Sequence, residues 1–311
     1  MATLSPRTAD GRREAVMIGR PPGLLDQLLS RFGRVILIGL PLVFLVIWTM
    51  VPLVWAFLAS LKDPLEIYES TTFLPREPSL AAYWTVLGMD GFGKWMFNTI
   101  LVTVVATIVP LALSIIAAYG FARYLFRFRH LLLLAYLVPR IIPRVSLIVP
   151  LNDLMTELGL INTYWVLFIT YIASAVPLAT WILVGFFKSV PKEIEESATL
   201  DGANLWQRLR YVILPIAWPG VVTAAVLCIR EGWNEFSFVL ALVTETGMRT
   251  LPYALYMLKD SMGVQDYAVY NAFTMLTVLP LLVVYLLLER RVVESICLLY
   301  TSDAADDAMN V

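Results

Sequence analysis

Long stretches without a charged residue most strongly limit how this chain can fold. Three of them run from Val35 to Leu61, from Trp95 to Ala122 and from Tyr164 to Phe187. Each exceeds the roughly 20 apolar residues that a helix needs to cross the hydrocarbon of a bilayer. Water cannot satisfy backbone N–H and C=O groups there, so each stretch must be helical. With 59% hydrophobic residues and a mean hydropathy of +0.75, the sequence predicts an all-α polytopic membrane protein.

Three further apolar segments contain or adjoin charges and complete a predicted set of six transmembrane helices. They cover Leu131 to about Leu151, about Ile216 to Val243, and Tyr267 to Leu288. In this topology the cytoplasmic segments hold 15 Lys and Arg residues and the outside loops hold 5. Because basic residues concentrate on the cytoplasmic side, both termini are expected in the cytoplasm of a bacterial-type inner membrane. Residues 1–34 form an arginine-rich cytoplasmic segment, and the first apolar run is too long for a cleaved signal peptide.

Charged residues also occur within the third and fifth predicted spans. Arg140 and Arg144 lie one helical turn apart, at about the same depth as Arg230 and Glu231. Burying such charges in hydrocarbon is expensive, so the two arginines are expected to pair with Glu231 or to line a water-filled path. Arg144 and Glu231 are therefore candidate residues of a solute path. The alternative is snorkelling from a tilted helix, and the role of Arg230 stays open.

A charged insertion between the fourth and fifth predicted spans predicts a cytoplasmic helix–turn–helix. Ser189 and Pro191 favour a helix start, and Gly202 favours a break. Asn204 with Gln207 three residues later has the spacing of a capping box and predicts a second helix. The apolar residues expected on one face of that helix are Leu205, Trp206, Leu209, Val212 and Ile213. A short helix, a bend and a second amphipathic helix suit docking onto a partner protein.

The spacing within residues 189–215 resembles a signature of the inner-membrane permease subunits of ABC importers. That signature reads Glu-Ala-Ala, three residues, Gly, nine residues, an aliphatic residue, one residue and Leu-Pro. The matching residues here are Glu196, Ser197, Ala198, Gly202, Val212, Leu214 and Pro215. Ser197 departs from the pattern, as one small residue in place of another. The resemblance implies a coupling loop that docks onto cytoplasmic ATPase subunits through Glu195, Glu196, Ser197, Ala198, Asp201, Gly202, Leu214 and Pro215. Glu196 either pairs with a basic groove of the ATPase or caps its own helix.

A second motif, Trp233-Asn234-Glu235-Phe236, resembles the carbohydrate-uptake class of these permeases. The likeness covers roughly 35–294 and is greatest to the second permease of maltose-type and trehalose-type importers. It implies a second permease, two ATPase subunits and an extracytoplasmic solute-binding protein as partners. Aromatic faces and carboxylate or amide groups suit sugars, so Trp233, Asn234 and Glu235 are candidate sugar contacts. The alternative is that they brace the span against the partner permease.

The sequence also limits the chemistry of the chain. It contains no G-x-x-x-x-G-K-[ST] loop, so the energy for transport must come from elsewhere. The resemblance implies that partner subunits bind ATP and that this chain holds no cofactor. One histidine and two cysteines offer neither a metal site nor a Ser-His-Asp triad, which disfavours a membrane-embedded enzyme. A net charge of −1 gives no reason to expect nucleic acid. A stand-alone secondary transporter or channel is the alternative function. The solute could be a disaccharide, an oligosaccharide, glycerol phosphate or a polyol.

The end of the chain departs from the rest of the pattern. After Glu294 the resemblance implies a short glycine-containing tail, whereas this chain ends CLLYTSDAADDAMNV. That string is similar to translated vector sequence. Residues 295–311 are therefore expected to be non-native, a divergent natural tail being the alternative. The permease domain is expected at 35–294.

Overall fold

The computed structural model describes residues 35–69, 72–262 and 267–309, so the predicted cytoplasmic segment at 1–34 lies outside the described residues. The chain divides into two units, Met1–Val54 and Trp55–Val311. The described part of the first unit holds a π-helical turn, η1 (Val35–Gly39), followed by most of α2 (Leu40–Ser60). Its large apolar side chains are exposed, as expected for a helix whose surroundings are hydrocarbon or other apolar helices.

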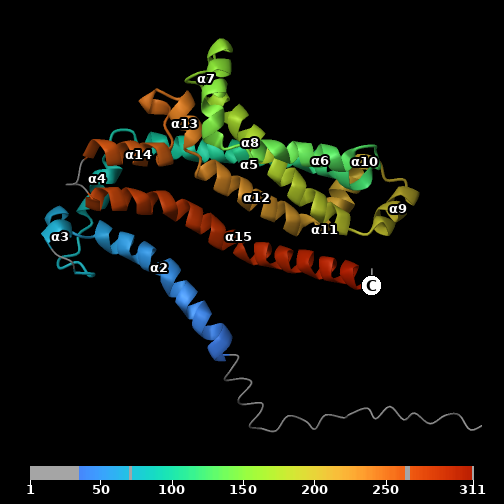
Figure 1. The fold of residues 1–311 in the computed structure, drawn as a ribbon, viewed down its shortest axis with the longest axis horizontal. Coiled ribbons are helices and arrows are strands. Elements are labelled where there is room, and N and C mark those ends of the chain that lie inside the picture. The colour runs from blue at the N-terminus through green and yellow to red at the C-terminus, as the bar shows by residue number, and fades with distance from the viewer. Residues whose placement is uncertain (1–34, 70–71, 263–266, 310–311) are drawn as a thin grey trace, which may run out of the picture. The chain divides into compact units, whose positions relative to one another are not determined.

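Four long helices form the centre of the second unit and run side by side (Figure 1). They are α5 (Phe92–Arg123), α8 (Tyr164–Ser189), α12 (Trp218–Trp233) and α15 (Tyr267–Met309). Small residues permit close approach: a Cβ placed on Gly232 of α12 would lie 3.2 Å from the Cα of Thr103 in α5. The shorter elements are α3 (Pro64–Glu69), α4 (Ala81–Leu87), α6 (Arg129–Leu137), η2 (Val138–Arg140), η3 (Arg144–Leu147), α7 (Ile148–Glu157), α9 (Lys192–Leu200), α10 (Leu205–Gln207), η4 (Arg208–Ile213), α11 (Leu214–Ile216), α13 (Ser237–Leu242), η5 (Thr246–Met248) and α14 (Leu251–Met262).

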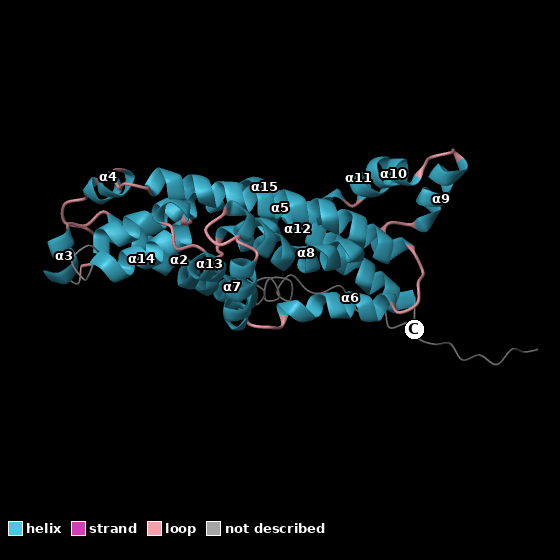
Figure 2. Ribbon diagram, turned by 90° about the horizontal axis from the view of Figure 1, so that it is seen from above, coloured by secondary structure: helices cyan, strands magenta, loops and turns pink. Residues whose placement is uncertain are grey.

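Three apolar clusters hold this bundle together. One joins α5, α8 and α12 at the end where α9 and α10 project, around Leu183, Phe187 and Ile213. At the opposite end, one cluster packs α13 against α5 and α8, and another packs α4 and α14 against α15. Figure 2 shows α9 and α10 at one end of the bundle and α4 and α14 at the other. The segment carrying the permease-like motif therefore extends from the end of the bundle.

The number of membrane crossings lies between four and six by helix length and composition in the described residues. Four single helices qualify: Ile36–Ser60, Phe92–Arg123, Tyr164–Ser189 and Tyr267–Leu288. Two bent helix pairs would raise the number to six if each pair crosses once. The multi-pass, all-helical prediction is confirmed for the described residues, and the count of six stays a prediction.

The third predicted span is not one straight helix. Residues Arg129–Arg140 and Arg144–Glu157 form two helical arms bent by 87°. Proline explains the break, because it lacks a backbone N–H and disfavours helical geometry in the residue before it. Pro139 and Pro143 flank the bend. The arm before the bend buries no side chain, and the arm after it buries only Met155 among its described residues.

The fifth predicted span is shorter than expected, because α12 ends at Trp233 rather than continuing to Val243. The side-chain amide of Asn234 donates a hydrogen bond to the carbonyl of Arg230 at 2.8 Å. A carboxylate oxygen of Glu235 accepts the backbone N–H of Phe238 at 2.9 Å. These side-chain bonds occupy backbone groups at the end of α12 and the start of α13, and so favour a break between the two helices.

The last helix continues through the region where the predicted permease domain ends. It runs as one element to Met309, beyond its membrane candidate Tyr267–Leu288. The origin of residues 295–311 stays a prediction.

Candidate functional site

Residues 189–215, named the coupling segment from here on, leave the end of α8 as a helix–turn–helix. Of the two residues predicted to favour a helix start, Ser189 is instead the last residue of α8, where its hydroxyl donates to the carbonyl of Phe186 at 2.8 Å. The next helix, α9, begins at Lys192 directly after Pro191. The break between α8 and α9 lies at Val190, which is buried in the same cluster as Phe187.

The glycine break and the capping box are both confirmed. Gly202 has a φ of +85°, a left-handed conformation that glycine adopts without a Cβ penalty. Its N–H bonds to the carbonyl of Thr199 at 3.0 Å, and that of Ala203 bonds to the carbonyl of Ala198 at 2.9 Å, which is the Schellman ending of a helix. Asn204 and Gln207 exchange side-chain to backbone bonds of 2.8 and 2.9 Å.

The predicted single apolar face of the second helix is wrong in part. Leu209 and Ile213 are buried against the bundle, whereas Leu205 and Trp206 are exposed. The reason is a π-helical turn over Arg208–Ile213, which changes the helical period assumed in the prediction. Trp206, at 57% exposure, and Leu200, at 89%, present apolar side chains outward from the tip of the coupling segment.

Glu195 anchors the coupling segment to the end of α5. Its side chain is buried, it accepts a hydrogen bond from the hydroxyl of Tyr119, and it forms an ion pair of 2.8 Å with Nε of Arg123. Arg208 approaches the same carboxylate at 3.9 Å and donates to the hydroxyl of Thr199 at 2.8 Å. A buried charge with several partners resists displacement, so α9 and the end of α5 are held as one unit.

The other predicted coupling residues lie mainly on the outer surface. Glu196 is exposed and accepts no hydrogen bond from its own helix among the described residues, so capping is not its role there. The remaining members are exposed Ser197, Asp201, Gly202 and Pro215, and half-buried Ala198 and Leu214. Leu214 and Pro215 begin α11, after which the chain bends by 81° into α12. Their part in ATPase coupling stays a prediction.

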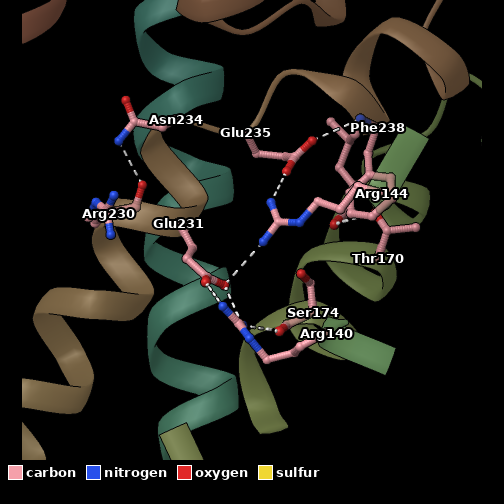
Figure 3. A network of polar contacts seen from close by, with 10 residues as sticks. Arg140, Arg144, Thr170, Ser174, Arg230, Glu231, Asn234, Glu235 and Phe238 are labelled. Atoms are coloured by element: carbon pink, nitrogen blue, oxygen red, sulfur yellow. Dashed lines mark hydrogen bonds and ion pairs between the residues drawn. The ribbon is translucent and has the colours of Figure 1, made fainter. Parts of the chain in front are cut away.

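A second candidate site is a cluster of four charges, Arg140, Arg144, Glu231 and Glu235, named the charge network (Figure 3). Arg140 forms a two-pronged ion pair with Glu231, in which Nη1 lies 3.1 Å from Oε2. Nη1 of Arg140 also donates to the carbonyl of Ser174 at 3.0 Å. The prediction that the arginine face pairs with Glu231 is therefore confirmed.

Arg144 joins the two acids. Its guanidinium lies 3.4 Å from Glu231 and forms an ion pair with Glu235, whose side chain is only 4% exposed. The charge network thus ties the bent arms of α6 and α7 to the end of α12. Next to it lies a cavity of about 230 Å³, lined by both arginines together with Thr170, Ser174 and Phe238.

Trp233, Asn234 and Glu235 do not converge on one site within this chain. The buried indole of Trp233 donates to the carbonyl of Thr277 in α15 at 3.1 Å. Asn234 is exposed on a different side of α12 from Glu235, as Figure 3 shows. Trp233 braces α12 against α15, and the predicted sugar contacts stay a prediction. No group of three or more potential metal ligands occurs in the part of the chain that the structure describes.

Two features escaped the sequence reasoning. Arg123, one of the 15 Lys and Arg residues of the predicted cytoplasmic segments, binds Glu195 of the coupling segment, which no motif in the sequence indicates. Glu235 was assigned to the solute, although it pairs with Arg144. The second pairing had a signal in the sequence, because both acids and both arginines are spaced four residues apart.

Comparison with known proteins places these sites in a family. Residues 111–294 match the family described as binding-protein-dependent transport system inner membrane component. The diacetylchitobiose uptake system permease protein NgcG of Streptomyces coelicolor is 33% identical over 81% of this chain and 85% of its own length. The trehalose transport system permease protein SugB of Mycobacterium tuberculosis is 31% identical over 80% of this chain and 91% of its own. A crystal structure of a bacterial ABC transporter that imports alginate superposes with a TM-score of 0.71 at 21% identity, covering 85% of this chain and 97% of that one.

Proposed function

The chain belongs to the family of inner membrane components of binding-protein-dependent transport systems, and we propose that it is one of two permease subunits in an ATP-driven sugar importer. Two cytoplasmic ATPase subunits and an extracytoplasmic solute-binding protein complete the proposed assembly. The solute is a di- or oligosaccharide, a class supported by the diacetylchitobiose and trehalose systems of the relatives. This chain performs no covalent chemistry in the proposal, and its partners hydrolyse ATP. Both termini lie in the cytoplasm.

The observation that carries the proposal is the coupling segment. It presents Leu200 and Trp206 outward beyond the bundle, while Glu195 fixes its base to Arg123 of α5. Exposed apolar side chains on a rigidly held helical tip suit insertion into a groove of a partner. A transporter that works alone would have no need for such a surface.

The same segment continues directly into the helix that carries the charge network. After the bend at Ala217, Glu231 lies about 21 Å along α12 at 1.5 Å per residue. A movement of the coupling segment therefore reaches the interior of the bundle through one helix. In this proposal the ATPase moves the coupling segment, α12 moves with it, and the charge network transmits the movement to the bent arms of α6 and α7.

Co-purification tests this function. The chain is co-expressed with a second permease and an ATPase subunit of a carbohydrate importer from the same genome, and the ATPase recovered with the tagged chain is measured. We expect Trp206→Ala to lose most of the ATPase while the second permease is retained. Trp165→Ala is the matched control, because this tryptophan is also exposed but lies at the far end of α8. Full recovery of the ATPase with Trp206→Ala and with Gly202→Val would overturn the proposal.

A further inference from the structure

Arg230 is the charge at membrane depth that the described residues leave without a partner. Arg140 and Arg144 pair with Glu231 and Glu235, so both acids are already engaged. Arg230 is exposed, and Figure 3 shows it with Asn234 on the side of α12 away from the charge network. Three arginines against two glutamates leave one positive charge to be neutralised from outside the described part of the chain.

The position of Arg230 in the bundle follows from the contact between α12 and α5. Gly232 packs on Thr103, which lies about 17 Å from Phe92 and about 30 Å from Arg123 along α5. Hydrocarbon about 30 Å thick, centred on α5, would include this level. Arg230 is two residues away from Gly232, so it lies at the depth of the membrane interior rather than at the membrane surface. A charge at this depth against lipid tails is strongly unfavourable.

The surface around Arg230 is a groove between α12 and α15, with a volume of about 480 Å³. Its walls are mostly aliphatic, with Leu227 on one helix and Leu281 and Leu282 on the other, and the other polar residues lining it are Thr223, Asn234 and Tyr285. Along α12 it runs from Thr223 to Asn234, about 16 Å or three helical turns. Two parallel ridges of side chains with a furrow between them are the surface on which a third helix packs.

These features favour a protein helix over the other possible occupants. A sugar path needs several groups that bond hydroxyls, and this groove is lined mainly by aliphatic side chains. The first span of this chain cannot neutralise Arg230, because α2 contains no acidic residue. Lipid tails offer no counter-charge. A transmembrane helix with one carboxylate satisfies both the aliphatic walls and the arginine.

We propose that the groove between α12 and α15 receives a transmembrane helix of the second permease subunit, and that an Asp or Glu on that helix pairs with Arg230. The pairing fixes which permease is accepted and in which register, because an apolar helix without the acid would leave the arginine unpaired. This inference rests on the proposed function and adds to it the surface and the chemistry that recognise the second permease.

The test uses the whole transporter, purified through a tag on this chain. Arg230→Glu is expected to lower the recovered second permease at least tenfold while the ATPase subunit still binds, because the coupling segment is untouched. Arg230→Lys keeps the charge and should recover the second permease within twofold. Lys259→Glu is the matched control, since it reverses an exposed cation in α14 outside the groove. Substitution of one acidic residue in a span of the second permease by Lys should restore assembly to Arg230→Glu.

A photo-reactive amino acid at Leu282 keeps the proposal testable if Arg230→Glu fails to accumulate. Leu282 is 49% exposed and lines the groove, so a photo-reactive residue at this position should cross-link to the second permease in a transporter that keeps Arg230. Cross-links only to lipid, or to a second copy of this chain, would overturn the proposal. Full assembly of the Arg230→Glu transporter would also overturn the proposal, whether or not sugar uptake changes. Changed uptake in that case would place the solute at Arg230. If the unmodified chain recovers neither ATPase nor second permease, the proposed function itself fails.

Discussion

The charge network makes an asymmetric prediction for Arg144 and Glu235. Arg144→Met removes the ion-pair partner of Glu235 and leaves its 4% exposed carboxylate with the N–H of Phe238 as its remaining bond. Glu235→Gln keeps an acceptor for that N–H. It also leaves Arg144, which is 34% exposed toward the cavity, within 3.4 Å of Glu231. We therefore expect the loss of the arginine to be the more damaging change.

The magnitudes follow from burial. Leaving one partner of a buried ion pair unpaired lowers the free energy of unfolding by about 3–5 kcal/mol. The loss of a charged hydrogen bond in Glu235→Gln should lower it by about 1.5–3 kcal/mol. The double variant Arg144→Met/Glu235→Gln removes both charges, so it should be more stable than Arg144→Met alone. At about 2–4 °C per kcal/mol for a unit of this size, Arg144→Met should lower the melting temperature by roughly 6 °C or more.

Thermal unfolding of the purified transporter, followed by tryptophan fluorescence, measures all three variants. Arg127→Met is the matched control, because Arg127 is exposed and its guanidinium lies over the ring of Phe128 rather than in the network. Its effect should stay within about 0.5 kcal/mol. If the double variant is as unstable as the sum of the single variants, Arg144 and Glu235 do not act as a pair, and the reasoning fails.

Three further predictions concern the coupling segment and its packing. Gly202→Val should reduce ATPase binding, because a φ of +85° strains a β-branched residue, whereas Gly202→Asn should retain binding. Co-purification with the ATPase compares the two variants, and equal loss of the ATPase would show that the backbone conformation is not the cause. Glu195→Ala should lower both the melting temperature and the stimulation of ATP hydrolysis, because it leaves the buried Arg123 without its carboxylate partner. Glu193 is exposed on the same helix, so Glu193→Ala should leave the melting temperature unchanged. Gly220→Ala would place a Cβ 2.2 Å from Cγ of Phe186 and should lower the free energy of unfolding by about 1–3 kcal/mol. Adding Phe186→Leu should restore part of this loss, and an unchanged melting temperature of Gly220→Ala would contradict the close α8–α12 contact.

The sequence predicted best those features that local chemistry controls. The charge-free runs at Trp95 and Tyr164 became α5 and α8, because a long apolar helix is the one solution for such a stretch in a membrane. Gly202 and the Asn204 capping box formed as expected, since each needs only neighbouring residues. Local rules sufficed at these places.

The sequence failed where distant contacts decide. The bend of 87° between α6 and α7 needs the prolines, but its direction is set by ion pairs to α12 that lie about 90 residues away in the chain. Glu195 directly precedes exposed Glu196 in the sequence, and the distant partners Tyr119 and Arg123 make it the buried anchor. A helical period of 3.6 also could not foresee the π-helical turn at Arg208–Ile213.

The two sides of α12 and of the turn that follows it make different contacts. Glu231 and Glu235 pair with Arg140 and Arg144 of the bent arms, so they connect this end of α12 to the chain's own interior. Arg230 and Asn234 face the groove beside α15, where a neighbouring subunit can dock. Because α12 begins directly after the coupling segment, a rotation of α12 would move both faces together. One helix of 16 residues therefore links the proposed ATPase-docking surface, the charge network and the proposed permease interface.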